Sequence, residues 1–498
     1  MNIYSLSGMH KADMVPRQLL IVCVFLIATI GSLCGRNETA SASINNRGVI
    51  EVDYDDVTGR GPRYYGVEWG WVDQDQELYV ERLRRLHGNV VRVQIFQNHF
   101  EPMNDNNDPS YAEIDFSKST LIDHQLGKTI TYEAMFKSLV REFPDMHFQI
   151  NIWLAASWNA ATPDGYLGLG GAFPPRDYAE HREFIHALAQ WLVSRCKIPA
   201  DHLSFTFVNE PNLKSFFVGT PDDLIRMAKE TRAALNEVSP AIQMGGLEEV
   251  HGTSWTDVFY SSRPAVCCDF WTFHVYEHNL SSVWNALDDR IRQLRKYGPV
   301  WVTEFADTVY GSPDAKMDFS GREAALEFAE LLGRLWPTGI TGIIHFRLSD
   351  TYIDTDRFGL GGWIGHGLFA DSRGTHANGR PYEPFPVYWV FANMYRELGG
   401  GRIVRTTAPD GLTVVSAKNK AESKERLAVW ITNSANEKRE SAIRVDHFPV
   451  TTVLFEVFDN MERDTPVETK VLSDGKVDIR ITIPPKSSFL YCFTSIRS

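Results

Sequence analysis

Residues 203–211, LSFTFVNEP, begin with a short run of apolar and aromatic residues and end in an asparagine, a glutamate and a proline. Such a run is typical of a parallel strand that is buried on both faces of its sheet. Seven similar runs lie between residues 64 and 348, and segments of helical periodicity separate them. Strands that alternate with helices predict βαβ units, and eight of these predict a (β/α)8 TIM barrel over residues 64–400. The expected strands are residues 64–70, 90–96, 147–154, 203–209, 242–247, 269–276, 300–306 and 342–348.

A doubly wound α/β sheet is the main alternative to the barrel. It would carry a glycine-rich dinucleotide-binding turn directly after a strand. Residues 359–365, GLGGWIG, miss the G-x-G-x-x-G spacing and follow no expected strand directly, so the barrel is favoured. The expected helices are residues 73–87, 132–143, 178–196, 222–238, 281–297, 322–335 and 386–398.

After three glycines at 399–401 the sequence changes to short strand-like runs with turn residues between them. This pattern is typical of an antiparallel β-sandwich, which we expect over residues 401–498. Residues 43–63 include a strand-like stretch, which is predicted to add one more strand to this sandwich. The other expected sandwich strands are residues 412–417, 427–432, 441–445, 452–458 and 477–483.

The N-terminal residues have the pattern of a secretory signal peptide. Lys11 and Arg17 precede an apolar stretch at 19–33, which is shorter than the ~20 residues of a spanning helix. An A-x-A-like cleavage signal follows at 40–42. We therefore expect residues 1–42 to be removed, leaving a secreted or periplasmic protein without stable membrane association. An uncleaved signal anchor is the alternative.

The composition narrows the function classes. The 498 residues are 43% hydrophobic and 23% charged, which excludes a disordered chain and a small disulfide scaffold. The formal net charge of −13 disfavours nucleic-acid binding, because phosphate backbones repel an acidic surface. Neither CxxC nor HExxH occurs, so no metal site is predicted. Three pairings remain open for the cysteines after the signal segment. These are Cys196, Cys267, Cys268 and Cys492.

Two glutamates lie at the ends of expected strands. Glu210 ends the fourth strand, just before Pro211, and Glu304 lies in the apolar run WVTEF of the seventh. A buried carboxylate costs several kcal/mol unless it is paired or faces a cleft. Barrel active sites are built where strands end, so the two carboxyls are expected to face each other. Glycosidic bond cleavage needs two such carboxyls. The alternative for Glu210 is a cap on the next loop.

The chain resembles the clan A glycoside hydrolases, which are retaining enzymes on a (β/α)8 barrel. In that clan an Asn-Glu pair ends the fourth strand and a glutamate ends the seventh. A His-x-Tyr motif at the sixth strand and an arginine in the second are further features of many members. The matching residues, in the same order along the chain, are Arg92, Asn209-Glu210, His274-Val-Tyr276 and Glu304.

The family pattern within the clan is nearest to families 39 and 5. The sequence departs from family 5, because the third strand ends without a histidine and the eighth lacks the usual tryptophan. Residues 366–371 and 381–388 resemble the eighth-strand loop and last helix of family 39, whose members also carry a C-terminal β-sandwich. The resemblance therefore favours the neighbourhood of family 39.

The resemblance also implies roles for the matched residues. Glu210 would be the general acid/base and Glu304 the nucleophile. Asn209 would hydrogen-bond the sugar 2-hydroxyl, and Arg92 and Tyr276 would hold Glu304 in its ionised form. An acid needs a raised pKa and a nucleophile needs its charge, so these roles are chemically consistent.

Further substrate contacts are expected from aromatic residues near strand ends, because sugar C–H faces stack on indole rings. Each such tryptophan can equally belong to the core, and the two in loops, Trp71 and Trp158, are the favoured platforms. Trp363 is assigned to the position of the tryptophan that usually follows the eighth strand. His274 is a substrate contact, with a buried histidine bonded to a carbonyl as the alternative. The remaining strand-end candidates are Trp69, Trp153 and Trp271.

The sequence thus predicts a secreted, retaining β-glycoside hydrolase that acts on a polysaccharide or its oligosaccharides. This chemistry requires no metal or organic cofactor. A non-catalytic carbohydrate-binding protein on a barrel scaffold is the alternative from another class. A transglycosylase with the same two glutamates is the alternative among enzymes. The sugar, the linkage and exo or endo action are not specified by the sequence.

Overall fold

The computed structural model describes most of the chain from residue 48 to residue 496. The predicted signal segment, residues 1–42, lies outside the described residues. Within the described part no helix has the length and apolarity needed to cross a membrane. The internal residues that are not described are 70–75, 102, 105–119, 124–127, 162–172, 215, 251, 263–266, 277–279, 307–320, 354–361, 365, 372–373, 375–376, 422–423, 450–451 and 474–476.

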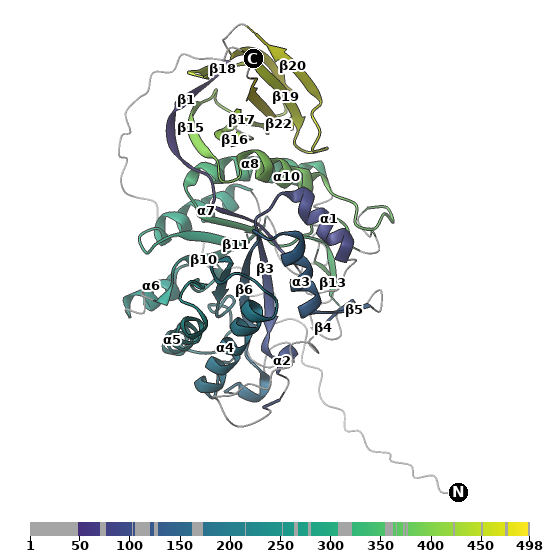
Figure 1. Ribbon diagram of the computed structural model, residues 1–498. Coiled ribbons are helices and arrows are strands. Elements are labelled where there is room, and N and C mark those ends of the chain that lie inside the picture. The colour runs from purple at the N-terminus through teal and green to yellow at the C-terminus, as the bar shows by residue number, and fades with distance from the viewer. Residues whose placement is uncertain are drawn as a thin grey trace, which may run out of the picture. The chain divides into compact units, whose positions relative to one another are not determined.

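The first sheet is parallel throughout and forms the predicted barrel (Figure 1). Its order is β8-β7-β6-β3-β2-β12-β11-β10-β9. The two end strands, β8 (Gln243–Met244) and β9 (Glu249–Val250), are pieces of one chain segment. β8 pairs with β7 and β9 pairs with β10, so this broken fifth strand closes the barrel. The other strands are β2 (Tyr64–Glu68), β3 (Val90–Phe96), β6 (His147–Leu154), β7 (Leu203–Thr206), β10 (Trp271–Tyr276), β11 (Val300–Ala306) and β12 (Gly342–His345).

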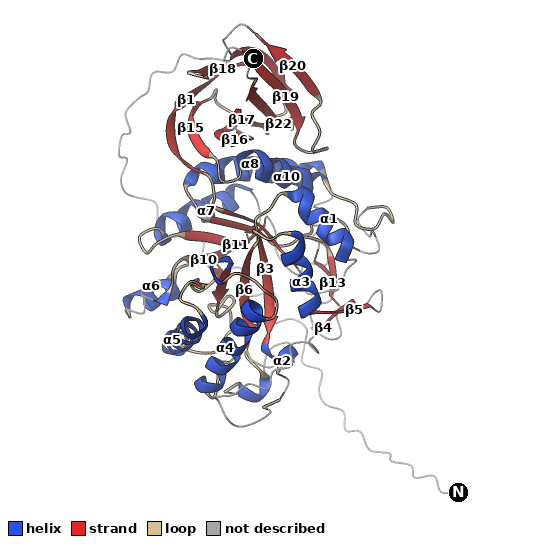
Figure 2. Ribbon diagram, viewed as in Figure 1, coloured by secondary structure: helices blue, strands red, loops and turns tan. Residues whose placement is uncertain are grey.

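Helices cover the outside of the barrel strands (Figure 2). A side chain caps the first turn of some of them. At the start of α5 (Pro221–Val238), Thr220 and Asp223 form a capping box and Pro221 is the first helical residue. The seven predicted helices are all present, whereas the four-residue α2 and the eight-residue α6 were not predicted. The helices are α1 (Gln76–Leu86), α2 (Gln97–Phe100), α3 (Tyr132–Glu142), α4 (Tyr178–Ser194), α5 (Pro221–Val238), α6 (Ser254–Ser261), α7 (Leu280–Leu294), α8 (Arg322–Leu335) and α10 (Pro386–Leu398).

The second sheet contains the C-terminal strands and β1 (Val49–Arg60), in the order β20-β19-β22-β17-β16-β15-β1-β18-β21. The C-terminal strands pair antiparallel with one another, as predicted. β1 pairs antiparallel with β15 but parallel with β18. Apolar residues of β19, near one end of this order, share a core with residues of β18 and β21 at the other end. The sheet therefore folds back over itself and forms the two layers of a sandwich. The strands are β15 (Arg402–Thr407), β16 (Thr413–Ala421), β17 (Lys424–Asn433), β18 (Arg439–Asp446), β19 (Val453–Asp459), β20 (Glu468–Leu472), β21 (Val477–Ile483) and β22 (Ser487–Ser495). Two small hairpins complete the strands: β4 (Thr120–Asp123) with β5 (Lys128–Thr131), and β13 (Thr351–Ile353) with β14 (Gly362–Ile364).

The barrel and the second sheet belong to one compact unit, residues 47–498. Helices α8 and α10 contact strands of the second sheet directly (Figure 1). Trp430 on β17 is buried there, and its Nε1 donates to the carbonyl of Ala329 on α8 at 3.1 Å. Arg426 donates two hydrogen bonds, of 2.7 and 2.9 Å, to the buried carboxylate of Glu397 on α10. The two parts therefore share apolar and charged contacts.

Candidate active site

The predicted site residues converge at the carboxyl ends of the barrel strands. Arg92 lies on β3, His274 and Tyr276 on β10, and Glu304 on β11, while Asn209-Glu210 follow β7. The parallel register places His274 beside Glu304. Glu210 has a left-handed backbone (φ 45°), a conformation that non-glycine residues adopt rarely and that occurs at functional sites.

Glu304 is held by two strong hydrogen-bond donors. Arg92 Nη1 donates to its Oε1 at 2.7 Å, and the hydroxyl of Tyr276 donates to its Oε2 at 2.5 Å. A further bond of 3.5 Å comes from the amide of Gln94. The side chain is almost fully buried, so each of these bonds acts in a low dielectric. The carboxylate of Glu304 is fixed in position by its neighbours.

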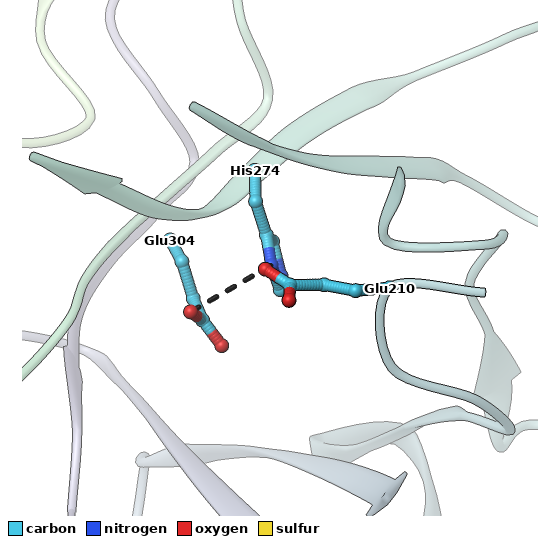
Figure 3. A group of neighbouring side chains, drawn as sticks. All are labelled: Glu210, His274 and Glu304. Atoms are coloured by element: carbon cyan, nitrogen blue, oxygen red, sulfur yellow. Dashed lines mark hydrogen bonds and ion pairs between the residues drawn. The ribbon is translucent and has the colours of Figure 1, made fainter. Parts of the chain in front are cut away.

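Glu210 faces Glu304 and is bonded to His274 (Figure 3). The distance between His274 Nδ1 and Glu210 Oε1 is 2.7 Å, and the same nitrogen lies 3.6 Å from Glu304 Oε2. One oxygen from each carboxyl lies within 4.8 Å of the other. His274 is completely buried, and burial lowers its pKa well below the usual value, so the imidazole is neutral. The neutral ring is hydrogen-bonded to Glu210 and lies next to Glu304, and it adds no charge to the pair.

The two carboxyls differ in acidity because their partners differ. Burial raises the pKa of Glu210 well above its usual value, and the negative charge of Glu304 adds to this rise. Burial also raises the pKa of Glu304, but Arg92 and the Tyr276 hydroxyl oppose the rise. Arg92 also opposes the rise for Glu210, but Glu210 forms no ion pair with an arginine among the described residues. Neighbouring carboxyls with separated pKa values are what an acid and a nucleophile require.

Arg92 is fully buried and organises further groups that the sequence analysis missed. Its Nη2 donates to Asn209 Oδ1 at 2.9 Å, which orients that amide, and to Glu248 Oε2 at 2.8 Å. Its Nη1 also contacts the carboxylate of Glu68. Both additional glutamates are completely buried at strand ends. Their signal in the sequence is the one that identified Glu304, a glutamate at the end of an apolar run.

The tryptophans occupy varied positions. Trp158 is half-buried in a short 3-10 turn, and its Nε1 donates to the carbonyl of Glu101 at 2.9 Å. Trp153, at the end of β6, is buried, and its ring lies 4.8 Å from that of Phe96 and 5.5 Å from that of Phe216. The contacts of Trp158 and Trp153 with a sugar stay predictions.

Two other tryptophans are core residues. Trp69 packs edge-on against Tyr79, and Trp271 packs against two aromatic rings of α6. Both are buried, which is the alternative that the sequence left open. Trp363 lies on β14, but its side chain is outside the described part of the structure, as is the whole of Trp71.

The donor atoms of Glu210, His274 and Glu304 lie within 4.8 Å of one another, a spacing that would also suit a cation. Arg92 already supplies positive charge to Glu304, and His274 is bonded to Glu210. A cation would need both carboxyls ionised beside that guanidinium. We therefore assign the three groups to acid–base chemistry. The four described cysteines, Cys196, Cys267, Cys268 and Cys492, form no disulfide.

One family model and one curated protein match parts of this sequence. The family described as "Glycosyl hydrolase catalytic core" matches residues 185–327, a stretch that includes Glu210 and Glu304. A β-xylosidase of Caldicellulosiruptor saccharolyticus is 30% identical over 116 residues, which are 22% of this chain. The match spans about a quarter (24%) of that relative's length.

Two solved structures share the fold over most of the chain. A glucosidase from Croceicoccus marinus and the family 39 (GH39) enzyme from Xanthomonas axonopodis pv. citri each have a TM-score of 0.64. Each is 15% identical, and the likeness covers 91% of this chain and 100% and 98% of the two structures. At this identity the likeness is one of fold. Together these matches confirm the predicted resemblance to the clan A glycoside hydrolases.

Proposed function

We propose that this protein hydrolyses β-glycosidic bonds with retention of configuration, using Glu304 as nucleophile and Glu210 as general acid/base. The observation that carries the proposal is the pairing of the two carboxyls. Their nearest oxygens lie within 4.8 Å, Glu304 is bonded to a guanidinium, and Glu210 is bonded to a neutral imidazole. Retaining enzymes place their carboxyls about 5–5.5 Å apart, whereas inverting enzymes leave room for a water at about 6.5–9.5 Å.

In the first step the proton of Glu210 passes to the glycosidic oxygen while Glu304 attacks the anomeric carbon. The bond to the leaving alcohol breaks, and a covalent glycosyl-enzyme ester forms on Glu304. Arg92 and Tyr276 keep the attacking carboxylate oriented before this step. Because the carboxylate is already fixed, less entropy is lost when the reacting groups reach the geometry of the transition state.

In the second step Glu210 takes a proton from water as the water oxygen attacks the anomeric carbon, and the bond between that carbon and Glu304 breaks. Formation of the ester removes the negative charge of Glu304. That charge is one of the causes that raise the pKa of Glu210, so its loss lowers the pKa and suits Glu210 to act as a base. The electrostatic coupling of the pair therefore changes in the direction that each step needs.

The first substrates to test are aryl β-xylosides and β-glucosides. The curated relative is named as a β-xylosidase, and one of the structures with the same fold is named as a glucosidase. An aryl leaving group departs without strong acid catalysis, so it separates the role of Glu304 from that of Glu210. We propose a carbohydrate as the substrate class and assign no single sugar.

The decisive experiment uses Glu210→Ala with azide. This variant should lose most activity on alkyl glycosides, keep more on an aryl glycoside, and be accelerated by azide with a β-glycosyl azide as product. Azide replaces the water that Glu210 would activate, and it attacks the glycosyl-enzyme from the same face. An α-glycosyl azide, seen by proton NMR, would refute retention.

Glu304→Ala is the companion variant, and it should be inactive on every glycoside while its Tm stays close to that of the wild type. Wild-type turnover in this variant would exclude the assignment. A wild-type protein that binds oligosaccharides but cleaves none would favour the carbohydrate-binding alternative. Glycosyl transfer to added sugar in preference to water would favour the transglycosylase.

We also propose that residues 1–42 direct the chain out of the cytoplasm and are then removed. The support is the charged, apolar and small-residue pattern of this segment. N-terminal sequencing of the protein recovered outside the cytoplasm should begin at Ser43. An intact Met1 on a membrane-bound product would favour the signal anchor.

A further inference from the structure

Two more carboxyls lie behind the catalytic pair. Glu68 ends β2 and Glu248 lies between β8 and β9, and both side chains are completely buried. Each contacts a different nitrogen of Arg92, whose first nitrogen also binds Glu304. Four carboxyls from four different strand ends thus meet in one buried region. Their charge state decides how much positive potential Arg92 offers to Glu304.

Four negative charges cannot be accommodated here together. The buried cations that act on these carboxyls are Arg92 and Arg347, and the charge of Arg347 acts on both Glu68 and Glu304. Arg290 is buried too, but its charge acts on Glu249 and His274. His274, which also faces the cluster, is neutral. An uncompensated buried charge is more costly than a protonated carboxyl, so two cations support two carboxylates. Two of the four carboxyls therefore carry a proton, and the catalytic acid Glu210 is one of them.

The contacts distinguish the second proton holder. Glu248 Oε2 accepts from Arg92 at 2.8 Å and from the amide of Asn151 at 2.5 Å, and it lies 3.9 Å from His274 Nε2. Glu68 is contacted through its Oε2 by Arg92 alone, and the buried Oε1 atoms of both glutamates have no hydrogen-bond partner among the described residues. Hydrogen bonds donated to a carboxyl favour its charged form. Glu248 has two such donors and Glu68 has one.

We infer that the resting site holds a second proton on Glu68, and that Glu248 is the carboxylate that positions Arg92 against Asn209 and Glu304. Burial raises the pKa of Glu68 to about 8 despite the opposing charge of Arg92, which agrees with this assignment. Glu248 is thus a positioning residue that acts through Arg92. The kinetic consequence for Glu304 rests on the proposed function, whereas the charge of Glu68 does not.

The charge of Glu68 can be measured without a substrate. If the folded protein keeps a proton that the unfolded chain releases, stability falls as pH rises from about 4.5 to about 8. Glu68→Gln retains the shape of the neutral acid and removes this titration. Between pH 5 and pH 8 the Tm of the wild type should therefore fall relative to that of Glu68→Gln, by roughly 2–4 °C. A Tm difference that stays constant over this range would overturn the assignment, because an ionised Glu68 titrates only at lower pH.

The role of Glu248 is tested by the pH profile of kcat/KM. Glu248→Gln removes a negative charge whose field raises the pKa of Glu210. It also leaves Arg92 more available to Glu304, so both limbs of the profile should move to lower pH by about one unit. Glu248→Asp keeps the negative charge. Both limbs of its pH profile should therefore stay near those of the wild type, even if kcat falls.

Glu249→Gln is the matched control. Glu249 is also buried and adjacent in sequence, but its carboxylate accepts from the backbone nitrogens of Trp255 and Thr256, at 2.9 and 2.8 Å, at the start of α6. This variant should lose stability without moving either limb. Limbs that move equally in Glu248→Gln and Glu249→Gln, or in neither, would overturn the positioning role. A protein with no glycosidase activity would refute the proposed function and leave the Glu68 measurement valid.

Discussion

Tyr276→Phe isolates one hydrogen bond to the nucleophile. The Tyr276 hydroxyl donates to Glu304 Oε2 at 2.5 Å in a nearly dry environment, and this bond lowers the pKa of Glu304. A hydrogen bond to a charged group contributes about 1.5–3 kcal/mol, which corresponds to about 1–2 pKa units. Because only ionised Glu304 attacks, the acidic limb of kcat/KM should move up by about 1–2 pH units. Activity below that limb should fall by about 10- to 100-fold.

The assay is the initial rate on an aryl glycoside from pH 4 to pH 9, with Tyr395→Phe as the control. Tyr395 is also buried, and its hydroxyl donates to the carbonyl of Gly66 at 3.0 Å, away from the strand ends that carry the site. Its loss should reduce stability by about 1 kcal/mol and leave the acidic limb in place. An acidic limb that does not move in Tyr276→Phe would show that this bond does not set the ionisation of Glu304.

Three further predictions concern the contact between the barrel and the second sheet. Trp430→Ala should destabilise the protein by about 3–5 kcal/mol, seen as a lower midpoint of denaturant unfolding, because it empties a buried site and removes the bond to Ala329. Arg426→Ala should cost a similar 3–5 kcal/mol, since it leaves the buried carboxylate of Glu397 with a weaker set of partners; Arg426→Lys should recover only part. Truncation after Gly400 should give a barrel that aggregates or melts at a markedly lower temperature, and a truncated barrel with the wild-type Tm would contradict the importance of this contact.

The strands of the barrel were well predicted because they are apolar on both faces. The predicted residues 90–96, 147–154 and 300–306 coincide with β3, β6 and β11. The fifth strand was predicted as one run, but it is broken at two glycines. A Cβ on Gly245 or Gly246 would lie 2.5 or 2.7 Å from the ring of Phe270 or Trp271. The two glycines make room for these rings. The rings belong to the sixth strand, so the sequence of the fifth strand alone does not reveal the break.

The second sheet was less predictable because the barrel covers part of it. A sandwich strand is expected to alternate between apolar and polar residues, since one face meets water. In β22 the side chains of Tyr491 and Phe493 enter the sandwich core, while Leu490 and Cys492 pack into the barrel core. The strand therefore has no polar face and was not predicted, and the same contact explains the buried Trp430.

The proposed catalytic pair could be predicted from the sequence because each glutamate interrupts or ends a run of residues that must be buried. Glu68 and Glu248 satisfy the same criterion, but local sequence does not say which strand ends meet. Only closure of the barrel brings both against Arg92. Glu210 and Glu248 also share left-handed backbones, with φ of 45° and 52°. Such strain, of order 1–3 kcal/mol, persists only where surrounding contacts fix it. The bonds to His274 and to Arg92 are such contacts, so the buried charge network that tunes the two carboxyls also holds the backbone that presents them.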